Sequence, residues 1–291
     1  MSVRKIKKIC SYVIRTLLVF SVLNSCQKSV SEDLDDDTPI PPVISDLNCL
    51  PTKIQITDQD GETYSTNYFY SNTGNPENCT ENSPDGSVFD WTMKPGSRRI
   101  DLIYNQWIEF DDSGRVSKSR MLFIPYDNDP YSTAYFDSYT YDTQGYIVSV
   151  RTVRDPNPLV TYLDSSLTLT TNTWDNGNLV KSKTVYLDGR STEIDFTYNL
   201  SVTSTGNEVL IDSYVSALFP GFFNTGKGNR NLKTGMTYKF REPDGSIWSG
   251  GTESYTNHTF DGQGNVLSYK VGSVSDGNSD TSTVSKSYRC F

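Results

Sequence analysis

Apolar and polar residues alternate along most of the chain from Leu50 onward, and apolar residues do not recur at the spacing of an amphipathic helix. Turn-forming dipeptides interrupt this alternation about every ten to fifteen residues. We therefore expect an all-β domain of successive antiparallel hairpins. Residues 71–96 are expected to form an insertion or long loop that includes a short strand at 88–91. The expected strands lie at residues 53–58, 62–70, 99–104, 106–110, 115–124, 133–141, 146–154, 160–174, 179–187, 192–200, 236–240, 246–260, 266–273 and 282–291.

One phrase recurs at the turns: an aromatic residue, Asp, two polar residues, Gly, one further residue and an aliphatic residue. Asp at the first turn position can accept a hydrogen bond from the backbone N–H two residues on, and Gly at the fourth adopts a positive φ without steric cost. This combination closes a β-hairpin with a bulge. Gly114, Gly145 and Gly177 are spaced by 31 and 32 residues, which indicates a degenerate repeat of two strands and their connections. The phrase occurs at 110–116, 141–147 and 260–266, one residue shorter at 174–179, and without its Asp at 70–75.

The number of strands predicts how the sheet ends. About twelve to fifteen sequential strands in an open sheet would leave two long edges, and closing the sheet removes both. A barrel of that size is too wide for side chains to fill, so its lumen would be wet or occupied by loops. Hydrophobic residues make up only 35%, with 19 Tyr and 13 Phe, which suits strands with one solvated face. We expect an antiparallel meander closed, or nearly closed, into a wide β-barrel over residues 49–291.

The N-terminus predicts export. Basic residues precede the apolar run at 17–23, which has the length of a signal-peptide core and is too short to span a bilayer. The sequence Leu-Asn-Ser-Cys at 23–26 resembles the lipobox of bacterial lipoproteins. This resemblance implies a signal peptide at 1–25 and attachment of lipid, such as palmitate, to the Cys26 thiol. The alternative is an ordinary secreted protein in which Cys26 falls there by chance.

Residues 26–48 are acidic and proline-rich, which predicts a tether. The acidic run at 32–37 also resembles the surface-export signal of Bacteroidota-type lipoproteins, whereas a plain solvated linker explains it equally well. The first interpretation places the domain on the outer face of the outer membrane. The second leaves open which face of that membrane it occupies.

The turn phrases, the segment at 222–232 and the lipobox with its tether together resemble an uncharacterised family of Bacteroidota lipoprotein domains described as porin-like in fold. The resemblance covers residues 50–291, and similar phrases occur in tyrosine-Asp (YD) repeat proteins. It implies a sheet curled into a barrel. The family has no assigned activity, so the resemblance transfers no functional residues.

A water-soluble domain is expected despite the porin-like fold. The last strand places Ser287 and Arg289 on the same face as Phe291, where a lipid-facing band would be apolar. The net charge of -9 and the absence of a basic stripe argue against nucleic acid as a partner. The expected partner is the membrane itself, through Cys26. The sequence does not set the oligomeric state.

Catalytic, metal and cofactor sites are not predicted. The single histidine, His258, has no catalytic motif around it and is expected on a strand surface. Clustered carboxylates do not match a calcium loop, and one histidine with dispersed cysteines does not make a zinc site. We therefore expect no enzyme, no cofactor and no metal. The carboxylates considered for calcium are Asp127 with Asp129, and Asp276 with Asp280.

Tryptophans are the candidate ligand contacts, because their rings could stack on sugars. Ordinary cross-strand packing is the alternative. These residues are Trp91, Trp107, Trp174 and Trp248.

Three cysteines follow Cys26 in the mature chain, so at most one disulfide and one remaining thiol are expected. In a barrel with an even number of strands the first and last strands are neighbours, which would allow Cys49 to pair with Cys290. Cys79 is the rival partner of Cys49.

The expected function is non-enzymatic binding or carriage of a small ligand, a glycan or a lipid. The alternatives are a structural or adhesive surface component and an acid-dependent glycosidase. Ligand binding predicts a lumen lined by converging Trp and Tyr. Adhesion predicts a filled lumen and an exposed apolar patch, and a glycosidase predicts isolated buried carboxyls of raised pKa.

Overall fold

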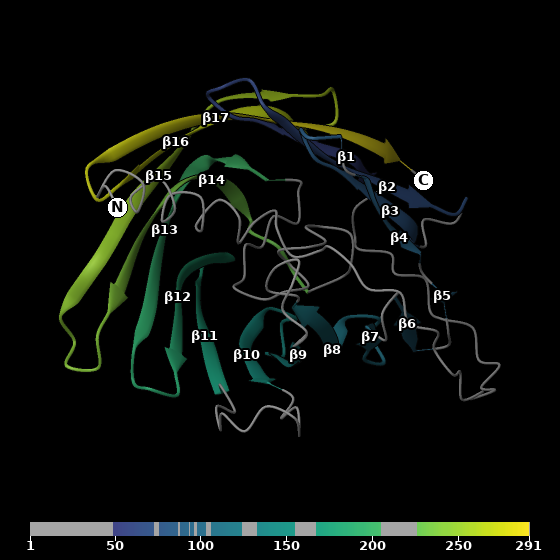
Figure 1. Ribbon diagram of the computed structural model, residues 1–291. Coiled ribbons are helices and arrows are strands. Elements are labelled where there is room, and N and C mark those ends of the chain that lie inside the picture. The colour runs from purple at the N-terminus through teal and green to yellow at the C-terminus, as the bar shows by residue number, and fades with distance from the viewer. Residues whose placement is uncertain are drawn as a thin grey trace.

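The computed structural model describes residues 49–72, 76–86, 88–92, 94–95, 98–102, 106–123, 133–154, 167–204 and 226–290. This part of the chain consists of strands and turns (Figure 1). The strands are β1 (Cys49–Thr57), β2 (Thr63–Tyr70), β3 (Pro76–Asn82), β4 (Val88–Thr92), β5 (Lys94–Pro95), β6 (Arg99–Asp101), β7 (Trp107–Phe110), β8 (Val116–Phe123), β9 (Thr133–Tyr141), β10 (Ile147–Arg154), β11 (Leu167–Asp175), β12 (Asn178–Tyr186), β13 (Ser191–Thr203), β14 (Asn231–Arg241), β15 (Ile247–Phe260), β16 (Val266–Ser275) and β17 (Asn278–Cys290).

The strands form one nearly closed antiparallel barrel. Each strand from β5 to β17 pairs with the next, β17 pairs with β1, and β1 continues through β2 and β3 to β4. Only Met93 separates β4 from β5, and these two short strands pair with β3 and β6 respectively, so they form a single interrupted strand. The 17 strands, with β4 and β5 taken as one, therefore occupy 16 positions, an even number that lets the first and last strands pair antiparallel. Figure 1 shows the wall curling from β6 through β11 to β17 and back to β1.

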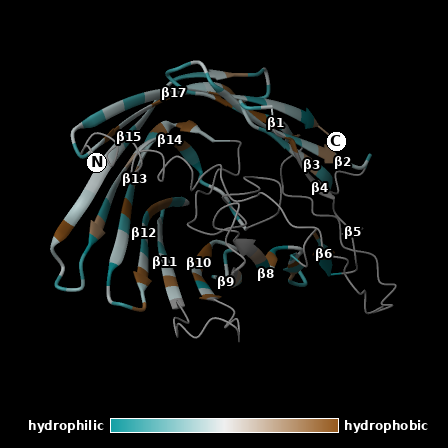
Figure 2. Cartoon of the chain, viewed as in Figure 1, coloured by the Kyte–Doolittle hydropathy of each residue, from teal (hydrophilic) through white to brown (hydrophobic). Residues whose placement is uncertain are grey.

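One face of the strands is buried and faces a common interior. The core cluster draws its side chains from β1 to β3 as well as from β6 to β10, β12 and β13. Residues alternate accordingly along each strand, and Figure 2 shows hydrophobic and hydrophilic positions alternating along the wall. Many interior side chains are polar: the hydroxyls of Thr170 and Thr184, opposite each other on β11 and β12, lie 2.8 Å apart. The modest hydrophobic content of the chain thus reflects a core that is partly hydroxylic.

The opposite face of β12 to β14 carries charges. Glu193 on β13 pairs with Lys183 of β12 at 3.0 Å and with Arg241 of β14 at 3.1 Å. The hydrogen bond from Lys183 is the main cause that lowers the pKa of the Glu193 carboxyl. Lipid-facing bands of transmembrane barrels are apolar. This face is instead one that water solvates.

The residues that the structure describes include no helix with the length and hydropathy needed to cross a membrane.

The recurring turn phrase has the geometry expected of it. The Asp111 Oδ1 atom accepts hydrogen bonds from the backbone N–H groups two and four residues on, each at 2.9 Å, and Asp142 and Asp261 repeat both bonds. The fourth position is left-handed in all three turns, with φ of 71° at Gly114, 91° at Gly145 and 88° at Gly264. The strand register shifts directly after each turn, which is the expected bulge.

Hydrogen bonds connect each hairpin to an earlier one through the aliphatic residue that ends the turn phrase. An aromatic N–H or O–H at a strand end donates to the carbonyl of the aliphatic residue that follows an earlier turn, and that aliphatic residue is buried. These aromatic links give the repeat a second role in addition to turn formation. They join Tyr141 to Val116 at 2.7 Å, Trp174 to Ile147 at 2.8 Å, Tyr198 to Leu179 at 2.7 Å and Tyr288 to Val266 at 3.1 Å.

The two ends of the barrel differ. Because neighbouring strands are antiparallel, the turns after β7, β9, β11 and β15 lie at the end that holds Cys49, here called the Cys49 end. The turns after β1, β12, β14 and β16 lie at the opposite end, here called the far end. All three full turn phrases and the shortened one therefore belong to the Cys49 end.

Two expectations about strands were wrong. Residues 71–96 contain a full strand, β3, in addition to the expected short one, and β3 pairs along its length with β2 and β4. Cys79 is the only apolar residue of β3 apart from Pro76, so the segment lacks an alternating pattern. β14 begins at Asn231 rather than at residue 236, because its first residues pair with β13 across two register shifts.

Candidate functional site

The three tryptophans whose side chains the structure describes, Trp107, Trp174 and Trp248, do not converge on one place. Trp107 alternates with the fully buried Ile108 on β7 and so lies on the outer face, where its ring contacts Phe136 at 6.2 Å and the Arg99 guanidinium at 4.8 Å. Trp91 pairs through its backbone with Cys79, and its side chain lies outside the described residues. Cross-strand packing therefore accounts for Trp107.

Trp174 is engaged by the protein itself. Its Nε1–H donates to the Ile147 carbonyl at 2.8 Å and its ring packs on Tyr146, with centroids 4.6 Å apart. The ring thus belongs to the aromatic links of the Cys49 end.

Trp248 is the tryptophan that the structure leaves available. It is 57% exposed at the far end, where its ring lies 5.3 Å from that of Phe240, which in turn lies 5.7 Å from that of Tyr238. We call Trp248, Phe240 and Tyr238 the aromatic strip. It runs from an exposed rim to a residue that is only 8% exposed.

A glycine positions the inner end of the aromatic strip. Tyr238 lies opposite Gly251 in the register of β14 and β15. A Cβ atom at Gly251 would lie 2.5 Å from the Tyr238 hydroxyl and 2.7 Å from its ring, so the tyrosine can lie over this position only because no side chain is present. The strip is thus shaped by the backbone as well as by its rings.

A second aromatic group lies further along the same wall. The Tyr255 and Tyr269 rings meet edge to face at 5.8 Å, and His258 stacks on Tyr269 at 5.5 Å. The Lys286 ammonium lies 5.6 Å from the Tyr269 ring, and burial lowers the pKa of Lys286 to about 7. Burial also lowers the pKa of His258. From the sequence we expected His258 on a strand surface, whereas the structure places it half-buried against the Tyr269 ring.

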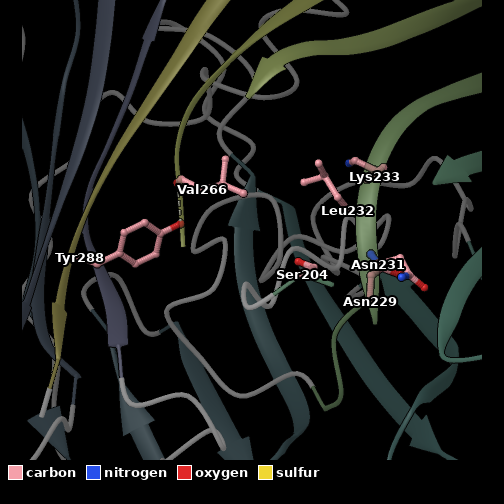
Figure 3. Close-up of a pocket in the computed structure, with 7 residues that line it drawn as sticks. All are labelled: Ser204, Asn229, Asn231, Leu232, Lys233, Val266 and Tyr288. Carbon is pink, nitrogen blue, oxygen red and sulfur yellow. Dashed lines mark hydrogen bonds between the residues drawn. The ribbon is translucent and has the colours of Figure 1, made fainter. Parts of the chain in front are cut away.

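A small cavity lies at the Cys49 end of the wall (Figure 3). It offers about 10 Å³ to the centre of a water molecule, which is about the minimum for one ordered water. The lining side chains come from β14, β16 and β17 and from the residues on either side of the β13 to β14 connection. They are Ser204, Asn229, Asn231, Leu232, Lys233, Val266 and Tyr288.

The Gly- and Lys-rich segment before β14 holds hairpins together. The Lys227 N–H donates to the Gly145 carbonyl at 3.0 Å, and the Arg230 N–H donates to the Gly177 carbonyl at 2.8 Å. Asn229 Oδ1 accepts a hydrogen bond from the Leu179 N–H at 2.9 Å and lies 3.0 Å from the Tyr198 hydroxyl. From residue 226 onward the segment therefore connects the turns of the Cys49 end. Residues 218–225 lie outside the described residues.

The cysteines and acidic candidates are placed as follows. Cys49 and Cys290 form a disulfide across the β1 and β17 pair, and Cys79 is a buried thiol. Asp276 accepts a hydrogen bond from Ser249 at 2.9 Å, and Asp280 accepts one from the Thr281 N–H. Within the described ranges no three His, Cys, Asp or Glu side chains are grouped as metal ligands would be. Cys26, Asp127 and Asp129, together with the turn at 73–75, lie outside these ranges.

The arrangement of strands was compared with known proteins. Two solved structures resemble it, each described as a porin-like protein, one from Bacteroides vulgatus ATCC 8482 and one from Bacteroides uniformis ATCC 8492. The fold is porin-like. Each match has a TM-score of 0.55 and covers 82% of this chain and 98% of the other, with sequence identities of 14% and 15% respectively. No family model and no curated protein matches the chain.

Proposed function

We propose that this protein is a non-enzymatic lipoprotein of the outer membrane, anchored through Cys26, whose barrel binds a small glycan at the aromatic strip. The observation that carries this proposal is the aromatic strip itself. The exposed face of Trp248 can stack on a sugar, and the Phe240 and Tyr238 rings behind it continue the aromatic surface towards the interior. The porin-like fold supports a barrel wide enough to admit such a ligand.

The anchor and the ligand are tested on the full chain. Cys26→Ser should release the protein from membranes of its host, and continued membrane association would contradict the anchor. Native mass spectrometry of the detergent-extracted wild type should show an extra mass that disappears on denaturation and that identifies the glycan.

Binding of that glycan is then measured by isothermal titration calorimetry. Trp248→Ala should weaken binding about fivefold, because stacking on one aromatic ring contributes about 1 kcal/mol. Ile247→Ala is the matched control, since Ile247 is the 54% exposed neighbour of Trp248 and has no ring. Equal losses in the two variants would contradict ring stacking.

A surface adhesive is the second candidate, favoured by the apolar residues exposed at the far end. Leu187 is 57% exposed and Val274 is 51% exposed, and both lie at this end together with Ile247. An adhesive surface predicts a bare polypeptide mass and a loss of protein association in Ile247→Ala as well as in Trp248→Ala. The same pair of variants therefore separates the two functions.

A further inference from the structure

Lys233 is a buried cation that has no oxygen partner among the described residues. Its side chain is 8% exposed near the start of β14. The Nζ atom lies 4.5 Å from the centroid of the Tyr255 ring and 6.0 Å from that of Phe196, and both are cation–π contacts. An ammonium with no counter-ion in such a place is costly, because burial removes its hydration.

The nearest carboxylate does not complete the site. Glu253 raises the pKa of Lys233, but the two form no ion pair within 4.0 Å, and the Glu253 Oε2 atom accepts a hydrogen bond from the Tyr255 hydroxyl at 2.7 Å. Burial outweighs this effect and lowers the pKa of Lys233 to about 8. The protonated amine is therefore favoured at neutral pH, and it has no ion pair with the residues that the structure describes.

The cavity beside Lys233 provides the space for a partner (Figure 3). Other polar groups of its lining are already engaged. The Tyr288 hydroxyl donates to the Val266 carbonyl, and the Asn231 amide donates to the carbonyls of Leu200 and Val202. A group that enters here finds the Lys233 ammonium as its donor.

We propose that the cavity at the Cys49 end is an anion site in which the Lys233 ammonium binds one carboxylate group. The cavity has room for about one water, so a single oxygen of the anion can occupy it, and a flat carboxylate can present one oxygen here with less bulk around it than a tetrahedral phosphate. A charge-assisted hydrogen bond in a desolvated place is stronger than a neutral one. The carboxylate belongs to a small free acid or to an acidic sugar.

This site is separate from the aromatic strip. Lys233 precedes Tyr238 by five residues on β14, which corresponds to about 17 Å along a strand. The anion site and the glycan site can therefore be occupied, or fail, independently.

The test is the melting temperature of the full chain in detergent with sodium acetate or sodium glucuronate, compared with sodium chloride at the same ionic strength. At an anion concentration of ten times the dissociation constant, binding should raise the melting temperature of the wild type by about 3 to 6 °C. Lys233→Met should abolish the rise and should itself be at least as stable as the wild type without anion, because it removes an unpaired buried charge. Lys286→Met, the control, should keep the rise.

Three results would overturn the proposal. The rise in melting temperature could persist in Lys233→Met, it could be lost equally in Lys286→Met, or the wild type could show no rise with either salt. If only acetate raises the melting temperature, the ligand is a small free acid. If glucuronate raises it more than acetate does, the ligand is an acidic sugar. Trp248→Ala should retain the rise, so a failure of the glycan site would not be mistaken for a failure of this one.

Discussion

Single carboxylates organise the turns of this barrel. Asp111 illustrates the arrangement most fully, because one oxygen receives two backbone N–H groups while the other receives the Arg115 guanidinium at 2.7 Å. Burial raises the pKa of this carboxyl, but the hydrogen bonds from the Arg115 side chain and the backbone outweigh it and leave the pKa below its ordinary value of 3.8. The ionised form is therefore favoured in the folded protein.

This shift predicts a dependence of stability on acid. Because the folded pKa is depressed, the stabilisation is fully present above about pH 4 and is lost as the pH falls through the folded value. Asp111→Asn keeps an acceptor for the backbone and loses the ion pair, so it should cost about 1 kcal/mol at pH 7. Urea unfolding at pH 7 and at pH 2.5 should show this difference shrinking in acid. A difference of the same size at both pH values would contradict the assignment.

At the scale of the elements, hairpins are joined by the aromatic links. Tyr198 illustrates the geometry, since its hydroxyl reaches the Leu179 carbonyl at 2.7 Å from the strand that follows. Each link satisfies a carbonyl at a position where the bulge has shifted the ladder of hydrogen bonds. A carbonyl left without a partner in such a place is unfavourable.

Tyr198→Phe should lower the free energy of unfolding by about 1 to 2 kcal/mol, because it leaves the Leu179 carbonyl without this donor. Tyr238→Phe is the matched control, since the Tyr238 hydroxyl has no hydrogen bond to the described part of the chain, and it should change stability little. Chemical denaturation of both variants measures the effect. Equal effects in the two variants would show that the loss does not come from the link.

The sequence predicts the hairpins well because their signal is local. Asp142 and Gly145 lie three residues apart in one turn, and both have the roles expected of them. The aromatic links join residues 19 to 27 positions apart, so they become visible only when the strand register is known.

The candidate site was harder to predict, because it too depends on the strand register. Trp248 was expected to contact ligand and is exposed beside the other rings of the aromatic strip, whereas Trp107 faces outward because of the parity of β7. Lys286 lies two residues after the buried Val284 on β17 and therefore on the same face of the strand. This alternation is the sequence pattern that could have predicted its burial. Lys233 gave no such signal, because β14 begins with two register shifts.

At the scale of the whole molecule, one covalent bond closes the circle of strands. The Cys49–Cys290 disulfide links residues 241 positions apart. In the chain-entropy model, closing so long a loop in the unfolded state stabilises the folded protein by roughly 5 kcal/mol.

The double variant Cys49→Ser with Cys290→Ser should therefore unfold at a markedly lower temperature than the wild type. Reducing agent should lower the melting temperature of the wild type to that of the variant and should leave the variant unchanged. Differential scanning calorimetry measures both. An unchanged melting temperature in the double variant would show that strand pairing alone holds β1 to β17.

The same bond makes the molecule a lariat, a covalent ring of nearly the whole domain from which the N-terminal segment extends as a tail. A single proteolytic cut in any connecting loop would open the ring without dividing it. Both halves would stay attached to the tail until the disulfide was reduced. A nicked molecule should accordingly run as one species on a non-reducing gel and as two on a reducing gel. In the presence of proteases, this ring topology keeps the two halves covalently joined until a second cut or a reductant arrives.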